Sequence, residues 1–160
     1  MAGFLRRRLL DPVLALLRQG LSPRELSLSL AFGAGIGIFP VLGVSTPLLT
    51  VIALWMRLNL PAIQLVNYLA SPLQLLLIIP FVRVGEALTG SPPQPLTVSA
   101  GLDTLAQGAL HAVVVLWDAI VHAAIGWIAI GPALIWLAYR ALLPVLARAA
   151  TRLRTPDESR

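Results

Sequence analysis

The sequence predicts an all-α, polytopic helical membrane protein with broken or re-entrant N-terminal helices. Of its 160 residues, 58% are hydrophobic and only 12% are charged, which leaves too few charges to cover a soluble domain of this size. Residues 26–56, 58–82 and 119–139 contain no Asp, Glu, Lys or Arg. Each run reaches the roughly 20 residues that a helix needs to cross the hydrocarbon core of a bilayer. Glycine and proline interrupt the first two runs, at residues 33–47 and 71–72.

Basic residues mark both ends of the chain. Residues 1–20 carry four arginines and no uninterrupted apolar core, which argues against a secretory signal and predicts a basic amphipathic segment on the membrane surface. The alternative is a solvated positive tail that only orients the chain. Residues 144–160 predict a basic cytoplasmic tail. Because arginines favour the cytoplasmic side, both termini are expected there, and the number of full crossings is expected to be even.

The first helix start lies at the beginning of residues 21–90, the predicted motif-bearing membrane domain. Ser22, Pro23 and Glu25 have the spacing of a capping box, with proline at the first helical position. We expect the helix to run from Pro23 to about Phe39, because proline at position 40 disfavours helix in the residue before it.

Three further helix starts are predicted downstream. Thr46-Pro47 and Ser71-Pro72 each place a capping hydroxyl before a proline, and Asn59 before Leu60-Pro61 predicts a short helix between them. A helix from Pro47 to Met56 would cover only about 15 Å, so it cannot span the roughly 30 Å core alone. Both uncharged runs are therefore expected to be discontinuous, and the domain to contain two interrupted helical hairpins.

The paired breaks leave two interpretations open. Irregular backbone at membrane depth must face packed protein or a wet cavity, so the breaks either form re-entrant hairpins that fill a compact bundle or build a midplane binding site. In transporter folds such a site turns the positive N-termini of half-helices towards an anionic group. The candidate substrate-binding residues in that second case are Ser45, Thr46, Asn67 and Ser71.

Small residues repeat along the first helix. Gly33 and Gly37 lie four apart on one helical face, as do Ala31 and Gly35, and such strips let two helices approach closely. The partner helix is expected either in the same chain or in a second copy.

Residues 21–90 carry an ordered set of motif residues: Gly33, Gly37, Phe39, Pro40, Gly43, Thr46, Pro47, Asn59, Leu60, Pro61, Asn67, Ser71, Pro72, Phe81 and Gly85. This set resembles the bacterial domain-of-unknown-function 2062 family. The family commonly has asparagine where this chain has Ser71. The resemblance implies a helical protein of the bacterial inner membrane, and some relatives carry the domain beside envelope glycosyltransferase domains, which suggests lipid-linked sugars.

The second half follows a proline-rich connector at residues 91–95. Residues 96–143 predict an amphipathic helix, to about residue 121, and a final transmembrane span. His111, Asp118 and His122 fall on one face of that helix together with Gln107. This polar stripe is either a proton relay or the water-facing side of a helix at the membrane interface. The preceding broken segments would make one or three crossings.

Catalysis, metals and cofactors are not expected. The chain has no cysteine, and residues 26–56 offer hydroxyls with no His, Asp or Glu to act as a base. The two histidines of the stripe are about 16 Å apart along a helix, too far to share a metal ion. Topology and anionic lipid headgroups account for the net charge of +5, so no nucleic-acid partner is expected.

Two functions are consistent with these residues. The first is translocation of a small or lipid-linked anionic solute at the paired breaks. The alternative is a non-catalytic membrane scaffold that docks a cell-envelope enzyme. The expected partners are the lipid bilayer and either a second copy or an envelope-biosynthesis protein, and the expected location is the inner membrane, with several passes and both termini cytoplasmic.

Overall fold

The computed structural model describes residues 21–93 and 97–154, and these contain helices and no β-strand. The predicted all-α class is confirmed. The predicted surface segment 1–20, the last part of the connector and residues 155–160 of the tail lie outside the described residues. The helices are α2 (Pro23–Gly37), α3 (Ser45–Met56), α4 (Leu60–Thr89), α5 (Val98–Ala106), α6 (Ala109–Val115) and α7 (Trp117–Arg154).

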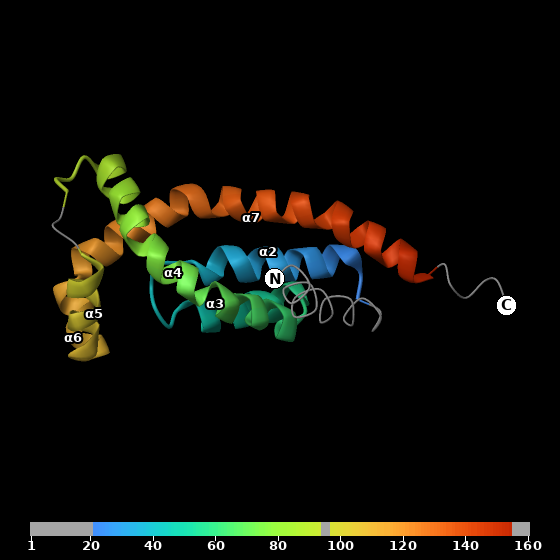
Figure 1. Cartoon of the computed structure of the whole chain (residues 1–160), viewed down its shortest axis with the longest axis horizontal. Helices are drawn as coiled ribbons and strands as arrows, with labels where there is room; N and C mark the ends of the chain where they lie inside the picture. Colours follow the sequence, from blue (N-terminus) through green and yellow to red (C-terminus); the bar gives the residue numbers. More distant parts are fainter. Residues whose placement is uncertain (1–20, 94–96, 155–160) are drawn as a thin grey trace, which may run out of the picture.

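Helix α2 lies at the centre of the bundle and packs against both α4 and α7 (Figure 1). It runs parallel to α4 and antiparallel to α7, since Leu26 at its start meets Ala62 of α4 and Leu146 of α7. Helix α3 turns back beside α2 and α4, so α2 and α3 form a hairpin. The N–H of Asn59 donates to Ser29 Oγ at 3.1 Å, which fastens the end of this hairpin to its beginning. We call this end the hairpin base.

The opposite end of the bundle is built by α4 and α7, with α5 and α6 beside them (Figure 1). Phe81 and Val82 of α4 pack there against Ala119 and Ala123 of α7. Trp127 joins this cluster to the one around α3. Its indole N–H donates to the Gly35 carbonyl at 3.0 Å.

Two predicted helix starts are confirmed, and both depend on local capping. Ser22 Oγ accepts from the N–H of Glu25 at 3.2 Å, while the Glu25 carboxylate accepts from the N–H of Ser22. Asn59 Oδ1 accepts from the N–H of Ala62 at 2.8 Å. Each cap satisfies donors that the first turn of a helix leaves free.

The helix predicted from Pro47 to Met56 is present as α3, but the cap predicted at Thr46 is absent, and the helix start predicted at Ser71-Pro72 is wrong. Helix α3 begins at Ser45 without a side-chain cap, because Gly43, with φ +82°, already turns the chain. Helix α4 is 30 residues long and continues through Pro72 without a break. The hydroxyl of Ser71 donates back to the Asn67 carbonyl at 3.4 Å instead of capping a new helix. The domain therefore has one interrupted hairpin, α2–α3, where two were predicted.

The predicted amphipathic helix up to residue 121 is also wrong. Gly108, with φ +123°, lies outside any right-handed helix and separates α5 from α6, while Leu116 ends α6 before α7 begins. The segment therefore consists of two short helices and the first turn of α7. The predicted tail is corrected as well, since α7 continues through residue 144 to Arg154.

Helices α4 and α7 are the two described helices that are long and apolar enough to cross a membrane. The most apolar windows of Leu60–Thr89 and Trp117–Thr151 are only 22% and 17% buried. A core helix of a soluble protein would bury its apolar residues, whereas these helices present them outward. Trp55, Leu76 and Ile128 are among the large side chains left exposed.

Replacement of Arg57 by glycine is expected to stabilise the hairpin base. Arg57 ends α3 in the left-handed conformation, with φ 54° and ψ 41°, where a Cβ clashes with the backbone and glycine does not. We expect a gain of about 0.5–1 kcal/mol in the free energy of unfolding, because relief of the left-handed strain exceeds the entropic cost of glycine. Thermal unfolding in detergent micelles measures it. Arg57→Ala is the control, because it removes the charge and keeps the Cβ. An equal gain from both variants would contradict the backbone explanation.

Candidate functional site

A cluster of polar side chains fills the crossing of α3 and α4. The Asn67 amide donates to Thr46 Oγ1 at 3.1 Å and to Gln64 Oε1 at 3.2 Å. The Gln64 amide donates to the Thr46 carbonyl at 3.1 Å and to Thr50 Oγ1 at 3.0 Å. Thr50 Oγ1 donates in turn to the Thr46 carbonyl at 2.8 Å. These side chains therefore bond mainly to one another and to the first turn of α3.

Gln74 extends the polar face of α4 towards the hairpin loop. Its amide donates to the Phe39 carbonyl at 2.6 Å, and its side chain is as deeply buried as that of Asn67, with 4% and 3% exposed. Phe39 follows the end of α2, where carbonyls lack helical partners. Gln74 thus satisfies irregular backbone that the hairpin would otherwise leave unbonded.

The structure brings together three of the four predicted substrate-binding residues. Thr46 and Asn67 share a hydrogen bond, and Ser71 bonds to the Asn67 carbonyl. Ser45 is buried at the start of α3. Within the described residues, every fully buried side-chain nitrogen and oxygen has a hydrogen-bond partner. The cluster therefore leaves no deeply buried donor aimed at an absent ligand.

Gln64, Thr50 and Gln74 were missed by the sequence analysis. A signal existed for the two glutamines, since positions 64, 67, 71 and 74 are spaced by three, four and three residues, which is one face of a continuous helix. The expected break at Ser71-Pro72 concealed this stripe.

Glycines allow the helices to touch backbone to backbone. A Cβ on Gly33 would lie 2.6 Å from the Ile63 carbonyl oxygen, and a Cβ on Gly37 would meet Ala70 at 3.0 Å. The partner of this small-residue face is therefore α4 of the same chain. A second close crossing joins Gly85 of α4 to Gly126 of α7, where added methyl groups would overlap carbonyl oxygens of the facing helix.

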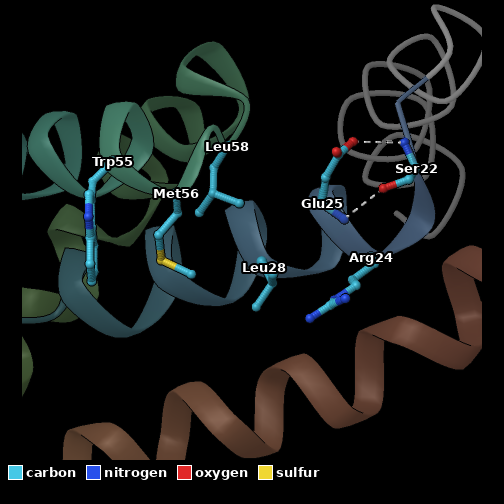
Figure 2. Close-up of a pocket in the computed structure, with 7 residues that line it drawn as sticks. All are labelled: Ser22, Arg24, Glu25, Leu28, Trp55, Met56 and Leu58. Carbon is cyan, nitrogen blue, oxygen red and sulfur yellow. Dashed lines mark hydrogen bonds between the residues drawn. The ribbon is translucent and has the colours of Figure 1, made fainter.

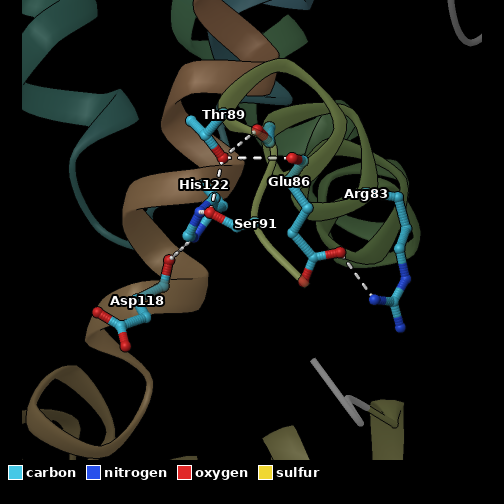
Figure 3. A network of polar contacts seen from close by, with 7 residues as sticks. Arg83, Glu86, Thr89, Ser91, Asp118 and His122 are labelled. Carbon is cyan, nitrogen blue, oxygen red and sulfur yellow. Dashed lines mark hydrogen bonds and ion pairs between the residues drawn. The ribbon is translucent and has the colours of Figure 1, made fainter. Parts of the chain in front are cut away.

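A polar network fastens the end of α4 to the start of α7 (Figure 3). His122 Nδ1 lies 2.6 Å from the Asp118 carbonyl oxygen, which can only accept, so Nδ1 is the donor. His122 Nε2 contacts Ser91 Oγ at 3.0 Å, and Ser91 Oγ contacts Thr89 Oγ1 at 2.9 Å. His122 is therefore held by its two neighbours in a fixed orientation.

The predicted proton relay loses its structural basis. His111 is exposed on α6, Asp118 is exposed on α7, and Asp118 meets His122 through its backbone carbonyl alone. Because α6 and α7 are separate helices, the three residues do not form the stripe on one helix that the hypothesis requires. In the described part of the chain, no three His, Cys, Asp or Glu side chains are placed to hold a metal ion.

Arg83 and Glu86 form an ion pair of 2.8 Å at the same end of α4 (Figure 3). The Glu86 side chain is only 3% exposed, whereas that of Arg83 is 41% exposed. A buried carboxylate needs such a partner, because desolvation of an unpaired charge is costly. The pair thus stabilises α4 beside its crossing with α7.

A cleft of about 540 Å³ opens at the hairpin base, between the start of α2 and the end of α3 (Figure 2). Arg24, Trp55 and Met56 line it together with the Ser22–Glu25 capping box. Its walls combine a cation, an exposed indole and apolar side chains.

The comparison with protein families decides the identity of the chain. Residues 6–154 match the family described as "Uncharacterized protein conserved in bacteria (DUF2062)". The chain belongs to this family. No curated protein and no solved structure matches it. The DUF2062 match extends beyond the motifs of residues 21–90 to α5, α6 and α7, so it covers the Gly85–Gly126 crossing and both apolar helices.

Proposed function

We propose that this chain is an integral protein of the bacterial inner membrane, with α4 and α7 as its two full crossings. Helix α4 has 30 residues and α7 has 38, or about 45 and 57 Å at 1.5 Å per residue, which exceeds the roughly 30 Å hydrocarbon core. Helices α2 and α3 have 15 and 12 residues and cover about 22 and 18 Å. The α2–α3 hairpin would therefore enter and leave on one side, as a re-entrant element.

The charges support one orientation. Residues 90–116, which join the two proposed crossings, contain no Lys or Arg. Arg24 and Arg57 flank the hairpin base, and Arg148 lies near the end of α7 on the same side as that base, as the packing of Leu146 indicates. By the positive-inside rule, the hairpin base and both termini face the cytoplasm.

Within this topology we propose a non-catalytic scaffold rather than a translocation pathway. The observation that carries this choice is the hydrogen bonding of the polar cluster, where Thr46, Gln64 and Asn67 bond to one another. A translocation site must offer polar groups to a solute in a wet cavity. A mutually bonded cluster instead fixes the packing of α3 on α4.

The hairpin base is the proposed docking surface for an enzyme of envelope biosynthesis. The glycine faces already pack against helices of the same chain, as Gly33 and Gly85 illustrate, so they are not offered to a partner. The cleft at Arg24 and Trp55 lies instead at the cytoplasmic interface of the proposed topology (Figure 2). Trp55 is 83% exposed, and Trp and Arg are enriched among interaction hot spots.

Cysteine accessibility tests the choice between scaffold and translocation. The chain has no cysteine of its own, so single cysteines can replace Ser45, Thr46, Asn67 and Ser71 without background. We expect none of these four to react with membrane-impermeant thiol reagents added from either side, because the proposed scaffold requires a packed cluster that water does not enter. Labelling is measured by the mass shift of protein recovered from sided membrane vesicles.

Two exposed positions provide the controls and test the topology. Cysteine at Arg24 should react only from the cytoplasmic side, and cysteine at Asp103 on α5 only from the opposite side. Reaction of the cluster cysteines from both sides would contradict the scaffold and favour translocation. Reaction of both control cysteines from the same side would contradict the two proposed crossings.

A further inference from the structure

A second cavity, of about 530 Å³, lies between the hairpin loop and helices α4, α5, α6 and α7. Its wall on α4 includes Leu75 and Ile79, its wall on α6 includes Val113, and its wall on α7 includes Ala119 and Ala123. Apart from Thr97, every lining residue is apolar, and none is titratable. We call this space the apolar cavity.

The depth of the apolar cavity follows from the two proposed crossings, on which this inference rests. Leu75 and Ile79 lie within the uncharged run 58–82, towards its Arg83 end, and Ala119 and Ala123 begin the uncharged run 119–139. The cavity therefore lies within the hydrocarbon layer, in the half farther from the cytoplasm. Water is a poor occupant there, because it needs two to four polar partners that this wall does not offer.

The size of the cavity suits a small apolar ligand. Its volume of about 530 Å³ falls in the range of about 300–1,000 Å³ that small-molecule sites have. An empty cavity would forfeit dispersion contacts along its whole wall. The abundant slender apolar molecules at this depth are lipid chains.

We infer that the apolar cavity binds one acyl chain of a phospholipid from the outer leaflet. The acyl chain lies between α4 and α6, where it contacts Leu75 and Val113. The end of the acyl chain reaches Ala119 and Ala123 of α7. Small side chains at positions 119 and 123 leave the room that the chain occupies. The phospholipid is thereby a structural ligand that completes the packing of α5 and α6 on the two crossings.

Native mass spectrometry of the full chain, extracted from membranes in a mild non-ionic detergent, tests this inference. We expect the wild-type protein to retain one phospholipid and Val113→Phe to lose it, because the larger ring fills the cavity from α6. Val114→Phe is the matched control: Val114 is 76% exposed and does not line the cavity, so its phospholipid should remain. A second pair makes the same comparison from α4, with Leu75→Trp expected to lose the lipid and Leu73→Trp to keep it.

The outcomes separate this inference from the topology beneath it. Wild-type protein without a bound phospholipid, or equal retention by both members of a pair, would overturn the acyl-chain site. If Val113→Phe does not fold, the Leu75 and Leu73 pair decides. Extraction with alkaline carbonate tests the topology separately. If the protein stays in the membrane pellet but both members of a pair retain the phospholipid equally, only the acyl-chain site is contradicted. If the protein is released into the supernatant, the two proposed crossings are contradicted as well.

Discussion

Replacement of Gly85 by alanine is expected to cause a large loss of stability, because one methyl group would separate α4 from α7. The new Cβ would overlap the carbonyl oxygen of His122, and its next neighbours are also backbone atoms of that residue. Backbone atoms cannot rotate away as a flexible side chain could. In an open helix the same change would stabilise by about 0.5–1 kcal/mol. Here we expect the free energy of unfolding to fall by about 1–3 kcal/mol, the usual cost of overpacking.

The measurement is the midpoint of thermal unfolding in detergent micelles, with the fraction of protein that elutes as a single species. Ala87→Leu is the control, since residue 87 is exposed on the same helix and a larger side chain there should change little. Gly126→Ala should cost as much as Gly85→Ala, because its Cβ would overlap the Phe81 carbonyl oxygen. The double variant should cost less than the sum, since both methyl groups open one crossing. A Gly85→Ala protein as stable as the wild type would refute the close crossing.

The parts of the fold that were predicted from the sequence depend on short-range interactions. The cap at Ser22 and Glu25 is complete within four residues, and the cap at Asn59 likewise. The three uncharged runs also follow from composition, and two of them became the long apolar helices α4 and α7. Such features need no knowledge of which helices meet.

The errors arose where a distant contact decides the local structure. Ser71-Pro72 has the local pattern of a helix start, yet the Asn67 and Gln74 side chains on either side of it bond to α3 and to the hairpin loop. Their shared face requires one continuous helix, and packing of that face outweighs the local cost of proline. The error at Gly108 was of the opposite kind. The stripe of polar residues predicted one continuous helix, whereas Gly108, with positive φ, separates two helices.

Some members of the candidate site were predicted from the sequence, but its hydrogen bonds were not. Thr46, Asn67 and Ser71 do lie together, because buried polar groups need hydrogen-bond partners. Their hydrogen bonds could not be predicted, since these bonds depend on how α3 packs against α4. Likewise, Gly126 was not recognised as the partner of Gly85, because the register of α7 against α4 is a property of the whole bundle.

The second large effect is expected from Asn67→Leu, which removes the central donor of the polar cluster. Leucine keeps the volume of the side chain, so no cavity forms, but Thr46 Oγ1 and Gln64 Oε1 both lose the hydrogen bond that Asn67 donates. Leaving partly buried acceptors without a donor costs about 1–3 kcal/mol. We expect the free energy of unfolding to fall by that amount, measured by thermal unfolding in detergent micelles.

Comparison with two further variants separates the network from a general loss of polarity. Tyr68→Leu removes a polar group from the next position of α4, where the side chain is 62% exposed, and it should leave the unfolding midpoint almost unchanged. Thr46→Val removes the other partner of the hydrogen bond. Once Asn67 is leucine, Thr46→Val should cost less than it does in the wild-type chain, because the acceptor it removes has already lost its donor. Strictly additive costs would mean that the Asn67–Thr46 hydrogen bond does not contribute to the packing of α3 on α4, which would weaken the argument for a scaffold over a translocation pathway.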